Sequence, residues 1–174
     1  MSEAELVANA VASHDAAAFA SLVRLHQGRL RAFLLRMTRR DYALTDDLAQ
    51  ETFLEAFRKI AQYRGEGSFA GWLYRIAYSR YLMAARQRKL ENLDDVPEPA
   101  LDTAPDVKLD LERAMAKLSP PERASLTMCF AFGFSHDEAA KILNLPLGTL
   151  KSHVTRGRDR LEALLRVPEE RKIA

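Results

Sequence analysis

Two helix starts between residues 119 and 165 most constrain how this chain folds. Ser119 is followed by two prolines and then by Glu122, the spacing of an N-cap, a first helical turn and a capping box. The same Ser-x-x-Glu spacing recurs at Ser135 and Glu138. Strand signals are scarce along the rest of the chain, so the sequence predicts an all-α protein.

A short turn separates the second of these helices from the last one. The middle helix should cover 136–143 and end at Asn144, a residue that tolerates a left-handed conformation. The segment 144–148 contains proline and glycine, so a final helix should open near Thr149 and run to about Leu165. Two helices joined in this way predict a helix-turn-helix, whose second helix lies in the DNA major groove.

The final helix has one apolar and one polar side at about 100° per residue. The apolar side consists of Leu150, Val154, Gly157 and Leu161. The polar side consists of Ser152, Thr155, Arg156 and Asp159, flanked by Lys151 and Arg158, with His153 near the other edge. Short polar groups can contact base edges, and cations can contact phosphates or guanines. The pattern favours a DNA-reading helix over the alternative, an ordinary amphipathic surface helix.

Composition limits the classes of protein to which the chain can belong. The 174 residues are 29% charged and 48% hydrophobic, which is typical of one globular domain or two small ones. No apolar run approaches the roughly 18 residues of a membrane span, and the first residues lack the basic region of a secretory signal. The single cysteine, Cys129, excludes an internal disulfide, favours a reducing cytoplasm and should be a buried thiol.

The charge of the chain is unevenly distributed. The segment 91–112 holds eight acidic residues and one lysine, so it carries −7, whereas the remainder carries +9. Three prolines lie in the same segment, at Pro97, Pro99 and Pro105. The sequence therefore predicts a flexible acidic linker between two basic helical halves. A segment that imitates nucleic acid is the sharper alternative to a plain solvated loop.

The first half should contain two long helices before residue 62. One is capped by Asp15 and runs through Arg40, with Gly28 as a place of interruption. The other should start near Thr45 or Asp46 and run to about Ala61. It carries an acidic stripe at i, i+4 spacing, formed by Asp47, Glu51 and Glu55. Like charges at this spacing weaken an isolated helix, so the stripe indicates a basic partner, with a solvated face as the alternative.

A glycine-containing loop and an aromatic, basic helix follow. Gly65 and Gly67 break the chain, and Ser68 should cap a helix that runs to Lys89. Between Arg64 and Lys89 there are six basic residues and one acidic residue. Aromatic rings interleaved with cations are typical of surfaces that bind single strands. We expect Tyr74 and Tyr78 to contact nucleic acid and Trp72 to lie in the core.

These motifs together resemble a group IV, extracytoplasmic-function (ECF), bacterial sigma factor of the sigma-70 family. The stretch DDLAQETFLEAFRKIAQYRGEGSFAGWLYRIA is similar to sigma region two. The stretch LSPPERASLTMCFAFGFSHDEAAKILNLPLGTLKSHVTRGRDRL is similar to sigma region four. The resemblance implies a region-two domain over 1–90, the acidic linker over 91–112 and a region-four helix-turn-helix domain over 113–174.

The resemblance also implies three sets of binding residues. The set expected to bind the clamp helices of the largest RNA polymerase subunit is Asp46, Asp47, Gln50, Glu51 and Glu55. The set expected to recognise and melt the minus-ten element is Arg64, Phe69, Tyr74, Arg75, Tyr78, Ser79 and Arg86. The set expected to read the minus-thirty-five element is Thr149, Lys151, Ser152, His153, Thr155, Arg156 and Arg158.

Further partners follow from the same resemblance. It implies contact with the flap of the second-largest polymerase subunit, a linker directed toward the RNA exit path, and control by an anti-sigma factor. It implies no covalent chemistry, cofactor, metal or small-molecule substrate, and a cytoplasmic location beside the nucleoid, or at the inner membrane when a membrane-bound inhibitor holds the chain. Relatives often carry Asn at Ser79 and Asp at Met83; Ser79 keeps a hydrogen-bonding group, and Met83 should pack on the apolar side.

Three other functions are weighed against this interpretation. A helix-turn-helix repressor or activator would bind duplex DNA without polymerase and leave the acidic stripe unused. An enzyme is disfavoured because the four histidines are scattered and the sequence contains no zinc-protease, phosphate-loop or nucleophile-elbow motif. A module whose main role is to bind an inhibitor stays open, since nothing in the sequence identifies such a partner.

Overall fold

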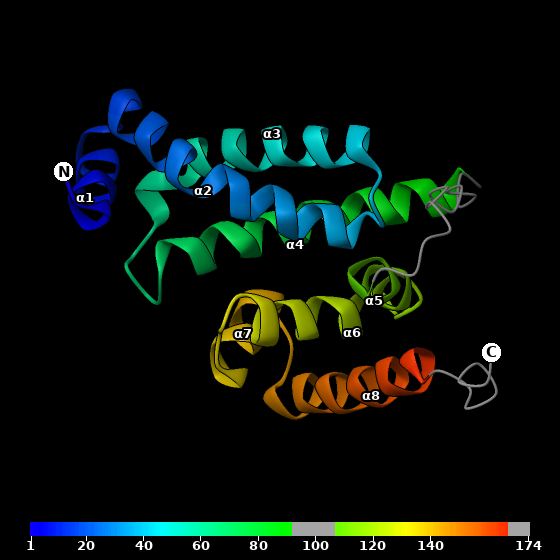
Figure 1. Ribbon diagram of the computed structural model, residues 1–174. Helices are drawn as coiled ribbons and strands as arrows, with labels where there is room; N and C mark the ends of the chain where they lie inside the picture. Colours follow the sequence, from blue (N-terminus) through cyan, green and yellow to red (C-terminus); the bar gives the residue numbers. More distant parts are fainter. Residues whose placement is uncertain (92–106, 167–174) are drawn as a thin grey trace. The chain divides into compact units, whose positions relative to one another are not determined.

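The computed structural model describes residues 1–91 and 107–166, and their regular secondary structure is helical throughout (Figure 1). The chain divides into two compact units, the first carrying α1 to α4 and the second α5, α6, most of α7 and α8. The predicted all-α class with two small helical domains is therefore confirmed. Within the described ranges, no helix combines the length and the hydropathy needed to cross a bilayer.

The first unit is a bundle of three long helices with a short helix at one end (Figure 1). Its elements are α1 (Glu3–Ser13), α2 (Ala16–Met37), α3 (Tyr42–Lys59), the 3₁₀ turn η1 (Ile60–Gln62) and α4 (Phe69–Leu90). Helices α2, α3 and α4 each pack against the other two, and α1 packs against α2 and η1. The predicted break at Gly28 is wrong, because α2 passes through this exposed glycine without interruption.

Side-chain caps begin the helices of this unit. Asp15 and Ser68 cap α2 and α4, as predicted from the sequence. The start of α3 was predicted too late: Asp41, not Thr45, accepts the Leu44 amide at 3.0 Å. Helix α1 was not predicted, although Ser2 and a glutamate three residues later form a complete capping box before it.

Two tyrosines predicted on the DNA-binding surface are instead buried. Tyr74 is 3% exposed, and its ring meets Phe33 edge-on with the centroids 5.6 Å apart. Burial raises the pKa of the Tyr74 hydroxyl, partly opposed by the charge of Arg29. Tyr78 is 4% exposed and stacks on Tyr81. The expectation of exposed stacking rings is therefore wrong at both positions, because α4 is covered by two neighbouring helices rather than one.

The second unit is built around its last helix. Its elements are α5 (Val107–Ala116), α6 (Pro120–Leu126), the π-helical turn η2 (Thr127–Ala131), α7 (His136–Leu143) and α8 (Leu147–Leu165). Helix α8 packs against α5 and α6. The predicted linker ended at residue 112, whereas α5 begins at Val107; the rest of that prediction lies mostly on 92–106, outside the described residues. Cys129 is half-buried rather than buried.

A tight turn joins α7 to α8. Asn144 has a φ of 53°, the left-handed conformation that Asn adopts more readily than most residues. The amide of Leu145 donates to the Ala140 carbonyl at 2.9 Å and closes the end of α7. Helix α8 starts at Leu147, two residues earlier than predicted, because the Leu150 amide already donates to the Pro146 carbonyl at 3.0 Å.

Helices α6 and α8 lie in close contact at Gly157. A Cβ atom at this buried glycine would lie 2.9 Å from Cδ1 and 3.2 Å from Cγ of Leu126, and 3.5 Å from Cβ of Glu122. Leu126 is itself buried, so it has little room to move. The absence of a side chain at Gly157 therefore sets the separation of the two helices.

We expect Gly157→Ala to destabilise the second unit by about 1 kcal/mol. Overpacking costs about 1–3 kcal/mol, and the better helix propensity of Ala offsets about 1 kcal/mol of it. Gly148→Ala is the matched control, since no atom lies within 4 Å of its added Cβ. Urea unfolding followed by circular dichroism should show lower stability for the first variant and unchanged or higher stability for the control. Equal stabilities would contradict the close-packing argument.

Candidate polymerase and nucleic-acid interfaces

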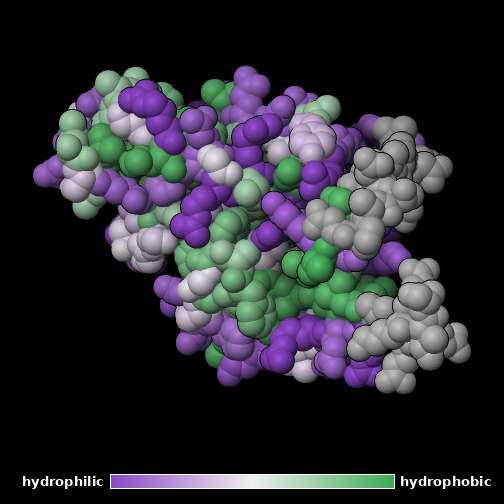
Figure 2. Space-filling view, viewed as in Figure 1, coloured by the Kyte–Doolittle hydropathy of each residue, from purple (hydrophilic) through white to green (hydrophobic). Residues whose placement is uncertain are grey.

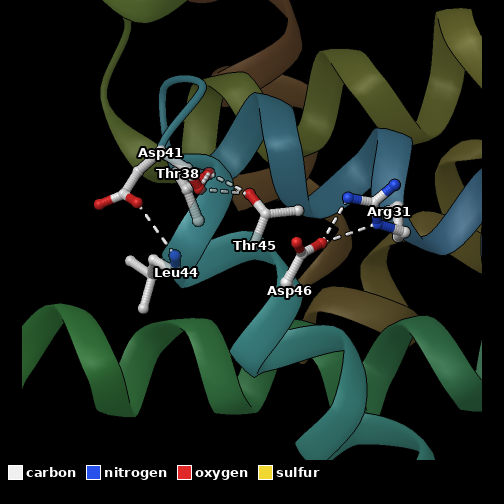
Figure 3. A network of polar contacts seen from close by, with 6 residues as sticks. All are labelled: Arg31, Thr38, Asp41, Leu44, Thr45 and Asp46. Atoms are coloured by element: carbon white, nitrogen blue, oxygen red, sulfur yellow. Dashed lines mark hydrogen bonds and ion pairs between the residues drawn. The ribbon is translucent and has the colours of Figure 1, made fainter.

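Helix α3 presents an exposed polar face. Asp46, Asp47, Gln50 and Glu51 are exposed, whereas Glu55 is half-buried. Asp46 accepts hydrogen bonds from Arg31 of α2, the Nε contact measuring 2.9 Å (Figure 3). Among the described residues, Asp47 has no ion-pair or hydrogen-bond partner, so its charge is available to another molecule.

A buried polar contact holds the start of α3 against the end of α2. The hydroxyls of Thr38 and Thr45 lie 2.8 Å apart, and the Thr45 hydroxyl donates to the Asp41 carbonyl at 2.7 Å (Figure 3). The carboxylate of Asp41 also accepts from Arg88 of α4 at 2.9 Å. These contacts join three helices and fix the orientation from which Asp46 and its neighbours project.

The C-terminal part of the acidic stripe, Glu51 and Glu55, is partly neutralised by basic residues of the same unit. Arg80 of α4 hydrogen-bonds Glu55 and lies 3.9 Å from Glu51, and Lys59 also pairs with Glu55. Burial acts to raise the pKa of Glu55, but the hydrogen bonds from Lys59 and Arg80 outweigh it and hold the pKa below 4.5. Glu55 is thus a structural member of the stripe, while Asp47 and Glu51 keep more of their charge available.

The loop after η1 leads into a cluster of rings. Arg64 is exposed beside Gly65 and Gly67, both with positive φ. Phe69 is buried against Tyr63 and Trp72, with ring centroids 5.7 Å away in each case. Trp72, predicted in the core, is half-buried. Phe69 therefore supports the loop from beneath rather than lying on the surface.

One face of α4 remains accessible. Its exposed residues include three of the predicted minus-ten set and two apolar neighbours: Arg75, Ser79, Leu82, Met83 and Arg86. Met83 is 58% exposed, so the prediction that it packs in the core is wrong. Within the described residues, neither Arg75 nor Arg86 forms an ion pair. This face combines free cations with apolar contact area, as single-strand surfaces do.

Helix α8 carries the remaining predicted set. Thr149, Lys151, Ser152, Thr155, Arg156 and Arg158 are exposed, and His153 is half-buried. In the space-filling view, hydrophilic residues line the outer edge of α8 (Figure 2). The Ser152 hydroxyl donates to the Gly148 carbonyl at 3.0 Å, which leaves its oxygen free to accept. The polar side predicted for α8 thus lies on its exposed face.

A buried carboxylate ties α8 to α6. Glu122 is 6% exposed and accepts hydrogen bonds from Arg160 at 2.9 Å and from the Ser119 amide at 3.2 Å. Burial acts to raise the pKa of Glu122, but the hydrogen bonds from Arg160 and Ser119 hold it below 4.5. Sequence analysis identified the Ser119–Glu122 capping box, but no local pattern reveals the partner in α8.

The chain was compared with known families and proteins. The family model "Sigma-70 region 2" matches residues 22–91, and "Sigma-70, region 4" matches residues 108–161. The ECF RNA polymerase sigma factor SigM of Mycobacterium tuberculosis is 34% identical over 168 residues, covering 94% of this chain and 85% of the relative. This chain belongs to the ECF sigma factors of the sigma-70 family. The resemblance inferred from the sequence is confirmed.

Other relatives and solved structures agree with this assignment. The sigma factor SigE of Mycolicibacterium smegmatis is 34% identical over 169 residues, covering 88% of this chain and 65% of the relative. The sigma factor RpoE, solved with the anti-sigma factor NepR from Bartonella quintana, superposes with a TM-score of 0.72 at 29% identity, covering 87% and 98% of the two chains. CnrH, solved with the cytosolic domain of CnrY, gives 0.70 at 25%, covering 94% and 96%.

The matched regions contain all three predicted sets of binding residues. The region-two match includes the α3 face and the exposed α4 face, and the region-four match includes α8 up to Leu161. The contacts that these residues make with polymerase or DNA stay predictions, as do the boundaries of the two domains. The structure adds two positioning arginines to this sigma factor that the sequence did not reveal, Arg80 of α4 behind the acidic stripe and Arg160 of α8, which ties that helix to α6.

Glu122→Gln should destabilise this sigma factor at neutral pH by about 1–3 kcal/mol, because the buried hydrogen bond from Arg160 loses its negatively charged acceptor. The folded pKa is depressed, so the stabilisation is present above 4.5 and disappears as the pH falls through the folded value. The stability difference between wild type and variant in urea should therefore narrow below pH 4.5.

Glu162→Gln is the matched control for this prediction. Glu162 pairs with Arg166 at 3.1 Å, but its side chain is 68% exposed. An exposed pair contributes about 0–1 kcal/mol, so this variant should stay close to wild type at every pH. A Glu122 variant as stable as the control would show that the buried pair does not hold α8 in place.

Proposed function

We propose that three exposed faces of this ECF sigma factor divide the work of promoter-specific initiation. The α3 face binds the clamp helices of the largest polymerase subunit, the α4 face holds the unpaired minus-ten strand, and α8 reads the minus-thirty-five element. The observation that carries the proposal is that each face is exposed, polar and inside a matched sigma region. The chain itself supplies binding energy and no covalent chemistry, cofactor, metal or small-molecule site.

The α3 face suits a basic partner. Asp47 and Glu51 lie one turn apart on an exposed surface, and Asp46 and Gln50 extend it. Opposite charges across an interface accelerate encounter and fix the register of binding. Arg31 and Arg80 pair with carboxylates of this face and so limit the repulsion among them. The acidic stripe is therefore tolerated in the unbound protein.

The α4 face suits a strand whose bases are unstacked. Arg75 and Arg86 can follow the backbone, Ser79 can hydrogen-bond a base, and Met83 offers apolar contact where no ring is exposed. Extruding a base costs a few kcal/mol, which polymerase contacts and capture near Arg64 would offset. Because Tyr74 and Tyr78 are buried, they support this face from beneath rather than stack on DNA.

The α8 face suits duplex DNA. Lys151 and Arg158 can neutralise phosphates, while Ser152, Thr155 and Arg156 can reach base edges. Thr149 lies at the start of the helix, where backbone amides favour a phosphate. The second unit would in addition contact the flap of the second-largest polymerase subunit.

Regulation by an anti-sigma factor is part of the proposal. RpoE and CnrH resemble this chain in fold and sequence. RpoE was solved with the anti-sigma factor NepR, and CnrH was solved with the cytosolic domain of CnrY. An inhibitor that covers the α3 face or α8 would block initiation without entering a pocket. The chain would act in the cytoplasm beside the nucleoid, or at the inner membrane while a membrane-bound inhibitor holds it.

Charge reversal on α3 tests the polymerase contact. In a pull-down with core RNA polymerase, the double variant Asp47→Lys, Glu51→Lys should bind at least about tenfold more weakly, since two attractive contacts become repulsive. Glu66→Lys is the matched control, an exposed acid-to-base change in the same unit but off α3. If the wild type binds no polymerase while it still binds duplex DNA, a helix-turn-helix repressor or activator becomes the better explanation.

Removal of cations from α4 tests the minus-ten contact. With holoenzyme, Arg75→Ala and Arg86→Ala should each reduce permanganate-detected promoter opening and lower the salt slope of binding by about 1. Arg24→Ala, which removes an exposed arginine from α2, should leave both measurements unchanged. Equal effects of all three substitutions would mean that α4 contributes only general positive charge.

A further inference from the structure

His153 and Arg156 touch on the exposed part of α8. The Arg156 Nη2 atom lies 3.4 Å from Nδ1 of His153, one helical turn earlier. A guanidinium can only donate hydrogen bonds, so Nδ1 must be the acceptor. The imidazole is then neutral with its proton on Nε2, and the contact fixes both the tautomer and the position of the guanidinium.

The surroundings of His153 favour this neutral form. Burial lowers the pKa of the imidazole below 6.5, the nearby Arg156 guanidinium lowers it further, and Glu122 of α6 partly opposes both. The Glu122 carboxylate is already engaged by Arg160 and the Ser119 amide. Among the described residues, the charges that act on His153 are thus the Arg156 cation on its own helix and the committed Glu122 carboxylate on α6.

We propose that neutral His153 is a positioning residue for Arg156, which it holds at the angle needed to read a base in the minus-thirty-five element. The inference rests on the proposed function of α8. An unrestrained arginine samples many rotamers, whereas one anchored at Nη2 keeps its remaining donors in a narrower range of orientations. Bidentate donation to guanine is the commonest specific contact of arginine, and its geometry tolerates little error.

Protonation of His153 should affect base discrimination by α8 and its total DNA affinity differently. Protonation of Nδ1 would place two donors and two positive charges against each other and release Arg156. The released guanidinium and the new imidazolium still attract phosphates, so total DNA affinity would hold or rise in acid while base discrimination falls. A merely structural histidine would instead lose affinity for every sequence together.

The test uses holoenzyme made from the full chain and core RNA polymerase. The promoter is one mapped by transcript sequencing after overexpression, with single base-pair changes across its minus-thirty-five element. Comparison of wild type with Arg156→Ala identifies the base pair that Arg156 reads. The measured quantity is the discrimination ratio, the binding of the mapped promoter divided by that of the duplex changed at this base pair.

We expect the wild-type ratio to fall at least about threefold as the pH drops from about 7.5 to a value below the lowered pKa of His153. His153→Gln should keep the ratio at the higher pH, because the Gln carbonyl can accept from Arg156, and should lose the pH dependence. His153→Ala should show a low ratio at both values. Lys151→Ala is the matched control, since loss of an exposed phosphate contact should weaken both duplexes equally and leave the pH dependence intact.

Two results would overturn the proposal. If His153→Gln shows the same pH dependence as wild type, or if His153→Ala keeps the full ratio, His153 does not position Arg156, while the reading of DNA by α8 stands. If wild-type holoenzyme discriminates at no position of the minus-thirty-five element, the proposed role of α8 fails and this inference fails with it.

Discussion

Side-chain caps set the geometry on which both units depend. A helix start leaves amides without partners, and among the described residues Ser or Asp side chains supply acceptors before six helices. At Asp41 and Glu122 the same carboxylate that belongs to a cap also accepts from an arginine of another helix, Arg88 or Arg160. Capping and packing are therefore one interaction at these two places, and the helix cannot shift without breaking both.

The charged residues of the first unit differ in how far their charges are already satisfied. Glu55 is enclosed by Arg80 and Lys59, and Asp41 by Arg88 and an amide, so these acids stabilise the fold. Asp47 on α3 and Arg75 on α4 have no such partner among the described residues. Charges held at the surface without local neutralisation cost stability through repulsion, and binding to another molecule explains their presence better than folding does.

Local patterns are sufficient for the class, the family and the starts of α2, α4, α6 and α7, because these depend on neighbours in the sequence. Ser68 and Ser119 each accept an amide three residues later and so mark the starts of α4 and α6. Ser2 and Glu5 form an equally clear capping box before α1, a helix that was not predicted. The start of α3 was predicted too late because Thr45 and Asp46 are also good caps. Thr45 is instead buried and hydrogen-bonded to Thr38, the C-cap residue of α2, a contact that no local pattern contains.

The orientation of α4 could not be obtained from periodicity alone. A helical wheel shows which residues share a side of a helix, but not how many of its sides are covered by neighbouring helices. Because α2 and α3 both pack on α4, the buried side extends past Leu73 to Tyr74 and Tyr78, and Met83 is left exposed. The same limit applies to α8, where Arg160 shares the basic character of Arg156 but turns to Glu122. Two arginines one turn apart thus differ in their contacts: Arg160 fixes the helix to its unit, whereas Arg156 contacts His153 and is the one that we propose reads DNA.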